Sequence, residues 1–124
     1  MTVSYQVTAE GGPGGIVSAR DFVYCFKTGY KNGGSVFFQG GMSVDSDLAP
    51  KSPKGLVRAW NGPGAQIVRP LSGGGSGCEF IWLMDCDYKG WIPSHILELA
   101  MPVAQLQFVE CVRKLADGIK AGKL

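Results

Sequence analysis

The sequence is poor in charge, in histidine and in long apolar runs. Only 18% of its 124 residues are charged, and the formal net charge is +2. A nucleic-acid-binding domain would typically have a pI above about 9 and clustered Lys and Arg, so we expect no nucleic-acid partner. The chain is also 45% hydrophobic, which excludes a disordered, highly charged tail.

No stretch is apolar enough to cross a membrane. The longest apolar run, Phe80 to Met84, is far shorter than the ~18 residues that a spanning helix needs. The first residues lack the basic and apolar regions of a secretory signal peptide. The sequence therefore predicts a soluble cytoplasmic protein, and a chain of 124 residues predicts a single domain spanning residues 1–124.

The few metal-binding residue types are scattered. Cys25, Cys78, Cys86 and Cys111 form no C-x-x-C pair, and His95 is the only histidine. Because zinc sites use closely spaced cysteines and histidines, we expect no metal and no cofactor. Without a signal peptide, the cysteines are predicted to be reduced and mostly buried thiols.

Catalytic motifs are lacking as well. The chain has no G-x-S-x-G nucleophile elbow and no Walker A loop. A cysteine nucleophile would have to rely on His95 as its base, and this residue is more simply an exposed residue of a first helical turn. Asp85 and Asp87 could pair as acid and base or could cap a turn. The sequence thus favours a protein that is not an enzyme; if it were one, Tyr24 would be the best acid/base candidate.

What the sequence does have is glycine, 19 residues gathered in clusters that are typical of turns. Between these clusters, apolar and polar residues alternate with the period of β-strands. Val3, Tyr5 and Val7, for example, form the apolar side of a half-buried strand. The predicted strands are 3–8, 16–27, 35–44, 56–60, 66–71 and 78–87. The turn residues at 29–34 predict a hairpin, 61–64 a tight turn, and the whole series an antiparallel sheet.

The period changes after Pro93. Ser94 is a plausible N-cap, and apolar residues then recur at spacings of three and four, which predicts one long helix. This stripe is Leu97, Met101, Ala104, Phe108, Cys111, Leu115 and Ile119. Pro102 is predicted to kink or restart the helix because it cannot donate a backbone hydrogen bond. Strands followed by one long helix indicate an α+β fold.

Aromatic and sulfur-containing side chains gather on like-parity positions of two predicted strands. They are Phe22, Tyr24, Phe26, Phe80, Trp82 and Met84. They could form an ordinary packed core, or they could line an apolar cavity with a few polar anchors, which is the usual form of a small-molecule site. In the second case Gln6, Asn61 and Gln105 are candidate anchors, and Met101 and Phe108 come from the helix.

Four segments together carry a resemblance to a known family. They are SARDFV at 18–23, GGMS at 40–43, VRAWNGPG at 57–64 and WLMDCDYKGWIP at 82–93. From about Val3 to Leu115 the chain closely resembles the START lipid-transfer domain, and within it the sterol-binding group. The resemblance implies a helix-grip fold, in which a curved antiparallel sheet wraps around a long C-terminal helix. A single lipid would sit in the tunnel between them and need no chemistry.

The resemblance also implies a set of site residues. Asn61 and Trp82 match positions that face the cavity in relatives. The loop from Gly11 to Val17 matches the gate of the tunnel, where we single out Gly14, Gly15, Ile16 and Val17. The predicted ligand-binding residues are Gln6, Tyr24, Phe26, Asn61, Trp82, Met101, Gln105 and Phe108.

The chain departs from the family in two ways. The family's opening helix and first strands are missing, so a truncated form could act as an interaction or regulatory fragment that pairs through an open sheet edge. Sterol-binding relatives also carry a buried arginine at the position of Phe26 and its acidic partner near Gln6. The joint loss of both charges indicates a changed cavity and favours, as an alternative to cholesterol, a more apolar ligand such as the carotenoid lutein.

Transfer of a lipid implies transient contact with a membrane surface. Arg113, Lys114, Lys120 and Lys123 could meet anionic headgroups, or could simply be placed favourably near a helix C-terminus. The expected location is cytoplasmic with peripheral membrane contact, endosomal if the chain is part of a longer protein.

Overall fold

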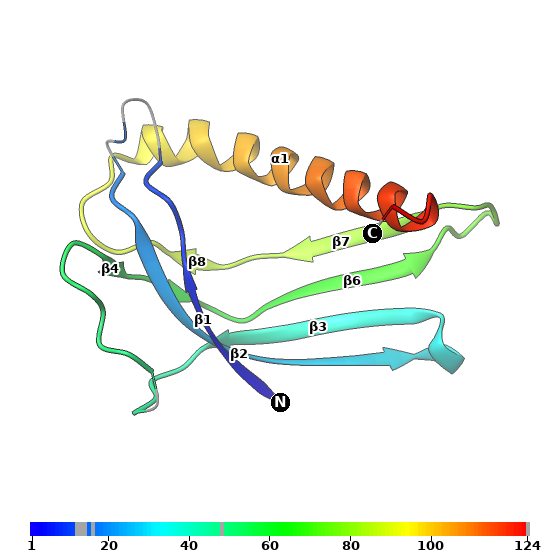
Figure 1. Ribbon diagram of the computed structural model, residues 1–124, viewed down its shortest axis with the longest axis horizontal. Helices are drawn as coiled ribbons and strands as arrows, with labels where there is room; N and C mark the ends of the chain where they lie inside the picture. Colours follow the sequence, from blue (N-terminus) through cyan, green and yellow to red (C-terminus); the bar gives the residue numbers. More distant parts are fainter. Residues whose placement is uncertain (12–14, 16, 48, 124) are drawn as a thin grey trace. The chain divides into compact units, whose positions relative to one another are not determined.

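The computed structural model describes residues 1–11, 15, 17–47 and 49–123 (Figure 1). The chain divides into two compact units, Met1–Gly90 and Trp91–Leu124. The first unit contains the strands and a short 3-10 helix, and the second contains one α-helix, so the predicted α+β composition is confirmed. The elements are β1 (Thr2–Val7), β2 (Arg20–Lys31), η2 (Asn32–Gly34), β3 (Val36–Ser43), β4 (Val57–Arg58), β5 (Trp60–Asn61), β6 (Gly64–Pro70), β7 (Cys78–Leu83), β8 (Cys86–Asp87) and α1 (Ser94–Lys120).

The first unit is built on one curved sheet. Its strands run in the order β1-β2-β3-β6-β7, and each neighbouring pair is antiparallel, as predicted. The short strand β4 adds a parallel pairing to the start of β2, and β5 pairs with β8 in a second, two-stranded sheet. Figure 1 shows β1, β2 and β3 bending along their length. Successive strands pair in β1-β2, β2-β3 and β6-β7, whereas β3 pairs with β6 across a longer stretch of sequence.

The hairpin between β2 and β3 is confirmed. Asn32, Gly33 and Gly34 all have positive φ angles, of 51°, 66° and 95°. A side chain at these angles is disfavoured except for Asn and Gly, so the sequence specifies the turn. β2 begins at Arg20 rather than residue 16 and continues to Lys31, because residues 28–31 still pair with β3.

The buried core lies at the start of β2. Phe22, Val23 and Ala59 are the buried apolar residues of the described chain. The predicted burial of the apolar side of β1 is wrong, because Val3 and Val7 remain 52% and 53% exposed. β1 is an edge strand, paired with β2 among the described residues, and on this side it is Tyr5 that meets Asp21 and Arg58.

Two predicted segments are divided differently. The predicted strand 78–87 is interrupted at Met84 and Asp85, so that β7 stays in the large sheet while β8 pairs with β5. The predicted turn at 61–64 shrinks, because Asn61 belongs to β5 and Gly64 already begins β6. This short connection takes the chain from one sheet to the other.

The second unit is the 27-residue helix α1 with short flanks. The helix continues through Pro102, so the predicted restart does not occur. The predicted N-cap is also wrong. Pro93 occupies the cap position without a side-chain cap bond, and Ser94 is already helical. Among the described residues, no helix is long and apolar enough to span a membrane.

Candidate functional site

A pocket of about 160 Å³ opens in the first unit. Residues from six strands line it, and most of them lie near the middle of the large sheet or at the connection between β5 and β6. They are Gln6, Tyr24, Gln39, Asn61, Gly62, Gly64, Ala65, Gln66, Trp82, Leu83, Met84 and Asp85. Alternate residues of a strand point to the same face of a sheet, so residues from several strands can line one pocket.

The strand register brings the lining side chains onto one face. Gln39 of β3 lies directly opposite Gln66 of β6, and Gln66 lies opposite Trp82 of β7. Opposite residues of neighbouring strands project to the same side of a sheet. Tyr24 joins this face through its pairing with Ser43, four residues from Gln39 on β3.

Two glycines let the backbone close one wall of the pocket. A Cβ atom added at Gly62 would lie 2.1 Å from Oδ2 of Asp85, and one added at Gly64 would lie 2.9 Å from the carbonyl oxygen of Leu83. The contact at Gly64 is with the backbone, so this position requires glycine for close approach. At Gly62 the contact is with the Asp85 side chain, which would have to shift. Gly62 and Gly64 are thus part of the wall.

The pocket combines neutral polar groups with a single acid. Burial raises the pKa of the Tyr24 phenol, so this group stays a neutral hydroxyl at physiological pH. Asp85 is the charged residue of the lining, and an ionised carboxylate accepts hydrogen bonds without donating any. The other polar side chains of the lining are the amides Gln6, Gln39, Asn61 and Gln66 and the indole of Trp82.

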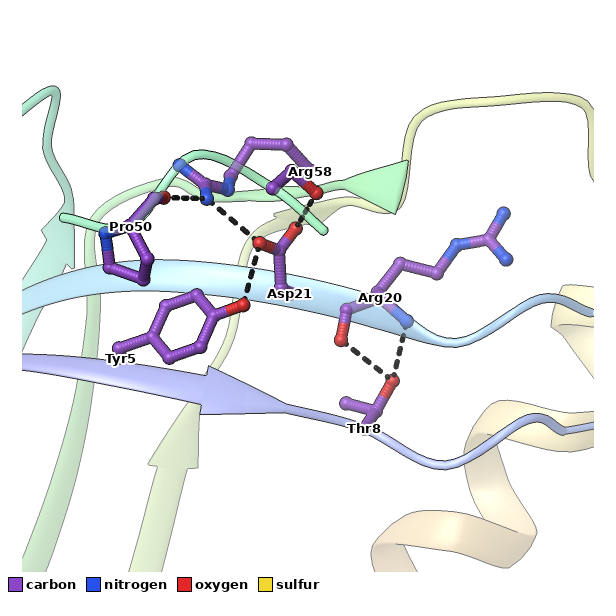
Figure 2. Close-up of polar contacts among 7 residues, drawn as sticks. Tyr5, Thr8, Arg20, Asp21, Pro50 and Arg58 are labelled. Atoms are coloured by element: carbon purple, nitrogen blue, oxygen red, sulfur yellow. Dashed lines mark hydrogen bonds and ion pairs between the residues drawn. The ribbon is translucent and has the colours of Figure 1, made fainter. Parts of the chain in front are cut away.

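Near the start of β2, a buried carboxylate holds three elements together (Figure 2). Asp21 is fully buried and accepts hydrogen bonds from Tyr5 (3.1 Å), Ser52 (2.9 Å) and Arg58 (2.8 Å). Nη2 of Arg58 also donates to the carbonyl oxygen of Pro50 at 2.8 Å. The bond from Arg58 holds the pKa of Asp21 below its ordinary value, although burial opposes this shift.

Arg20, one residue earlier, holds the chain after β8. Its guanidinium donates to the carbonyl oxygens of Tyr88 (3.2 Å) and Lys89 (3.1 Å) and also to that of Ser18. The Thr8 hydroxyl accepts a bond from the backbone N–H of Arg20 (Figure 2). Hydrogen bonds from a charged donor are strong, so these carbonyl oxygens stabilise the buried guanidinium. Arg20 can therefore be only 3% exposed without a carboxylate partner among the described residues.

Residues that could support catalysis or metal binding are dispersed. Among the described residues, no group of three or more His, Cys, Asp and Glu side chains could hold a metal ion. His95 is exposed in the first turn of α1, as predicted. Asp87 caps a turn, since its carboxylate accepts the backbone N–H of Lys89 at 3.0 Å.

The prediction of mostly buried thiols is wrong. All four cysteines are free, but Cys25 and Cys86 are only half-buried, and Cys78 and Cys111 are exposed. Cys78 opens the edge strand β7, and Cys111 lies on α1, which has no buried residue. Their positions explain their exposure.

Comparison with known sequences decides the family. The family model described as "START domain" matches residues 1–117. The chain belongs to the START family.

The relatives of this START domain are considerably longer. It is 36% identical over 117 residues to the mitochondrial Steroidogenic acute regulatory protein of Danio rerio, covering 94% of this chain and 40% of the relative. It is 33% identical over 121 residues to the protein of the same name from Homo sapiens, covering 98% of this chain and 41% of the relative. The chain thus spans about two fifths of the length of these relatives.

A solved structure shows the same fold. The structure titled "Human StAR-related lipid transfer protein 5" matches with a TM-score of 0.82 at 22% sequence identity, over 95% of this chain and 54% of that one. The curved antiparallel sheet and the single long C-terminal helix are therefore the elements of the START helix-grip fold, as the sequence predicted.

The structure brings four of the predicted ligand-binding residues together. Gln6, Tyr24, Asn61 and Trp82 all line the pocket. Phe26 does not belong to the lining; its ring stacks on Tyr24 with the centroids 6.0 Å apart.

The remaining predicted residues belong to the second unit or to the predicted gate loop. Met101, Gln105 and Phe108 belong to α1 in the second unit. Of the predicted gate, Gly14 and Ile16 lie outside the described residues, and Gly15 has a φ of 69°. Val17 pairs with Gly11 through two backbone hydrogen bonds of 2.9 Å, which close the base of this START loop.

Sequence reasoning missed two central residues of the lining, Gln39 and Gln66. Both lie on predicted strands, and their parity relative to Trp82 is set by the pairing of β3, β6 and β7. A search for apolar side chains passed over them. A search for polar residues among the apolar positions of paired strands could have found them.

Proposed function

We propose that this START domain binds one apolar lipid and carries it between membranes without catalysing a reaction. The observation that carries this proposal is the pocket, in which Trp82, Leu83 and Met84 provide apolar surface beside a few polar groups. This composition is typical of small-molecule sites. The similar solved structure is of a protein named as a lipid transfer protein, which supports the same function.

A sterol such as cholesterol is the leading ligand, and a carotenoid such as lutein is the alternative. The pocket of about 160 Å³ is smaller than the roughly 300–1,000 Å³ of a complete small-molecule site. We therefore assign it to one end of the lipid. The neutral residues Gln6 and Phe26, at positions where sterol-binding relatives carry a charge pair, favour a ligand end without charge.

Native mass spectrometry tests this function directly. The chain is mixed with liposomes that contain cholesterol or lutein, and we expect a monomer with one bound lipid. Trp82→Ala removes about 150–250 Å² of aromatic surface from the lining and is expected to lower the bound fraction about tenfold or more.

The matched control is Trp91→Ala, because Trp91 is 83% exposed and lies outside the pocket. It should leave uptake unchanged. An empty wild-type chain in both liposome preparations would contradict the proposed function. Equal uptake by wild type and Trp82→Ala would remove Trp82 from the site.

The location remains a proposal that follows from this function. A lipid carrier must reach membranes, and Arg113, Lys114, Lys120 and Lys123 of the second unit offer positive charge for anionic headgroups. We propose that the protein is cytoplasmic and contacts membranes peripherally. The relatives named as mitochondrial favour a mitochondrial surface over an endosomal one.

A second function, as an interaction or regulatory fragment, is favoured by one observation. The strand order leaves β1 and β7 each paired on one side only within the described chain. Such strands expose backbone N–H and C=O groups that can pair with another strand. A partner chain, or the remainder of a longer protein, would fit these edges.

A further inference from the structure

The polar part of the pocket is dominated by carboxamides. Gln6, Gln39, Asn61 and Gln66 come from four different strands and meet in one lining. A carboxamide carries two N–H donors and one carbonyl acceptor and has no charge at any physiological pH. The four amides therefore form a neutral surface that can both donate and accept hydrogen bonds.

Gln39 and Gln66 form the centre of this surface. They are directly opposite each other in the register of β3 and β6, a geometry that places Cβ atoms about 4.5–5.5 Å apart. Both side chains are half-buried. Within the described residues, the structure gives neither side-chain amide a hydrogen-bond partner.

Of the other two carboxamides in the lining, Gln6 uses its side chain in a hydrogen bond and Asn61 uses its backbone. Gln6 Nε2 donates to Ser4 Oγ at 3.4 Å, and the backbone N–H of Asn61 donates to Ser43 Oγ at 2.8 Å. The side-chain amide of Asn61, like those of Gln39 and Gln66, has no hydrogen-bond partner within the described residues. Gln39 and Gln66 differ from Asn61 because they lie directly opposite each other, so one ligand group could complete the hydrogen bonds of both. Water held there would have to be replaced when the lipid enters.

The negative charge of the lining disfavours anionic lipids as ligands. Asp85 is a carboxylate beside the amides, so a fatty-acid carboxylate or a phosphate would meet a like charge. Among the described residues, no Lys or Arg is part of the lining, although these residues commonly bind such anions. An uncharged hydroxyl, which donates one hydrogen bond and accepts others, complements the amide pair.

We propose that Gln39 and Gln66 hold the hydroxyl group of a neutral lipid and make this domain selective for hydroxylated lipids. This inference rests on the proposed lipid-binding function and deepens it. The two glutamines lie on β3 and β6, not on β1 and β2, which carry Gln6 and Phe26. Trp82, directly opposite Gln66, would contact the apolar body of the lipid next to the hydroxyl.

The experiment compares lipids that differ only or mainly in the hydroxyl group. Liposomes contain cholesterol or 5-cholestene, and in a second series lutein or β-carotene, and native mass spectrometry measures the bound fraction. Wild type is expected to prefer the hydroxylated member of a pair about tenfold, as one or two hydrogen bonds would give. In Gln39→Leu/Gln66→Leu this ratio should fall to about one, mainly through better uptake of the lipid without a hydroxyl.

Three further measurements make the outcomes distinct. Gln107→Leu makes the same chemical change at an exposed position of α1 outside the lining and should keep the wild-type ratio.

Gln66→Met, with a side chain of similar length, replaces the double variant if that variant does not fold. Thermal unfolding checks the folding of each variant. Uptake of 5-cholestene by wild type as strong as that of cholesterol, or a ratio that the Gln variants leave unchanged, would overturn this inference while the lipid-binding function stands. Failure of wild type to bind any of the four lipids would overturn the proposed function together with this inference.

Discussion

At the scale of single residues, the most constrained group is the carboxylate of Asp21. It is fully buried and receives hydrogen bonds from Tyr5, Ser52 and Arg58. An ionised carboxylate can be buried only when its lone pairs and its charge are satisfied. Since these donors come from β1, the 44–56 loop and β4, the single side chain connects three segments to β2.

We predict that Asp21→Asn lowers the free energy of unfolding by about 2–3 kcal/mol, because the charge-assisted bonds weaken and Arg58 loses its counter-charge. The guanidinium side chain is 36% exposed, so water recovers part of its solvation. Urea unfolding at neutral pH measures the change. Asp47→Asn, at an exposed position, is the matched control and should be neutral.

The same variant has a pH signature. Because the pKa of folded Asp21 lies below its ordinary value of 3.8, its contribution to stability is complete above 3.8 and is lost as the pH falls through the lower, folded-state pKa. The difference in stability between wild type and Asp21→Asn should therefore shrink in acid. A difference that stays constant between neutral pH and pH values below 3.8 would contradict the role of the ionised carboxylate.

The residue scale is also where sequence reasoning was weakest. Arg20, Asp21 and Arg58 entered only through the resemblance, because nothing in a single sequence reveals that a charge is buried until its partners are known. Gln39 and Gln66 were not predicted for the same reason, because the residues that surround them are set by strand pairing over long sequence separation. Trp82 and Asn61, in contrast, could be placed from the matched segments.

At the scale of elements, close strand approach is the main requirement. A Cβ atom added at Gly41 of β3 would lie 2.2 Å from the carbonyl oxygen of Cys25 and 2.8 Å from the Cα atom of Phe26 on β2. Both contacts are with the backbone, which cannot turn aside as a side chain can. The pairing of β2 with β3 at this point therefore depends on glycine.

We predict that Gly41→Ala destabilises the sheet by about 2–3 kcal/mol, the range of overpacking changes in well-packed regions. Thermal unfolding followed by circular dichroism measures it. Gly73→Ala is the matched control, since a Cβ atom there would meet nothing within 4 Å and the residue has no positive φ. Equal melting temperatures for Gly41→Ala and Gly73→Ala would contradict this prediction, because they would show that β2 and β3 accommodate the added Cβ atom without loss of stability.

Most elements could be predicted because their signals are local. The turn at 32–34 requires residues that accept positive φ, and the long helix follows from its apolar period. Boundaries were less predictable: β2 extends four residues beyond its predicted end because β3 continues to pair with it. The break between β7 and β8 depends on the partner strand β5, which no local pattern reveals.

At the scale of the whole molecule, the open edges of the sheet matter most. The chain covers 40% of the Danio rerio relative, and in the described part of the chain β1 and β7 each have a neighbour on one side only. We predict that the isolated chain without lipid self-associates as its concentration rises, through pairing of these edges. Sedimentation velocity over a wide range of concentration measures the association.

Charged residues on an edge strand are expected to prevent such pairing. Val3→Lys on β1 and Leu83→Lys on β7 change residues that are already 52% and 56% exposed, so the fold should tolerate them. Val103→Lys, at a 54% exposed position of α1, is the control. A wild-type chain that stays monomeric at every concentration would contradict the prediction.

The order of the two charged residues at the start of β2 has one more consequence. Arg20 and Asp21 are neighbours, so their side chains leave the strand on opposite sides, and each finds partners of only one kind: carbonyl oxygens for the arginine and hydroxyl or guanidinium donors for the aspartate. If β2 slipped by one residue against both β1 and β4, the cation would face Arg58 and the carboxylate would face carbonyl oxygens. In a half-formed sheet with that register, Arg20 would be repelled by Arg58 on one face and Asp21 by carbonyl oxygens on the other. The pair thus discriminates against misaligned folding intermediates, a task that the alternation of apolar side chains alone, with valines exposed on β1, performs poorly.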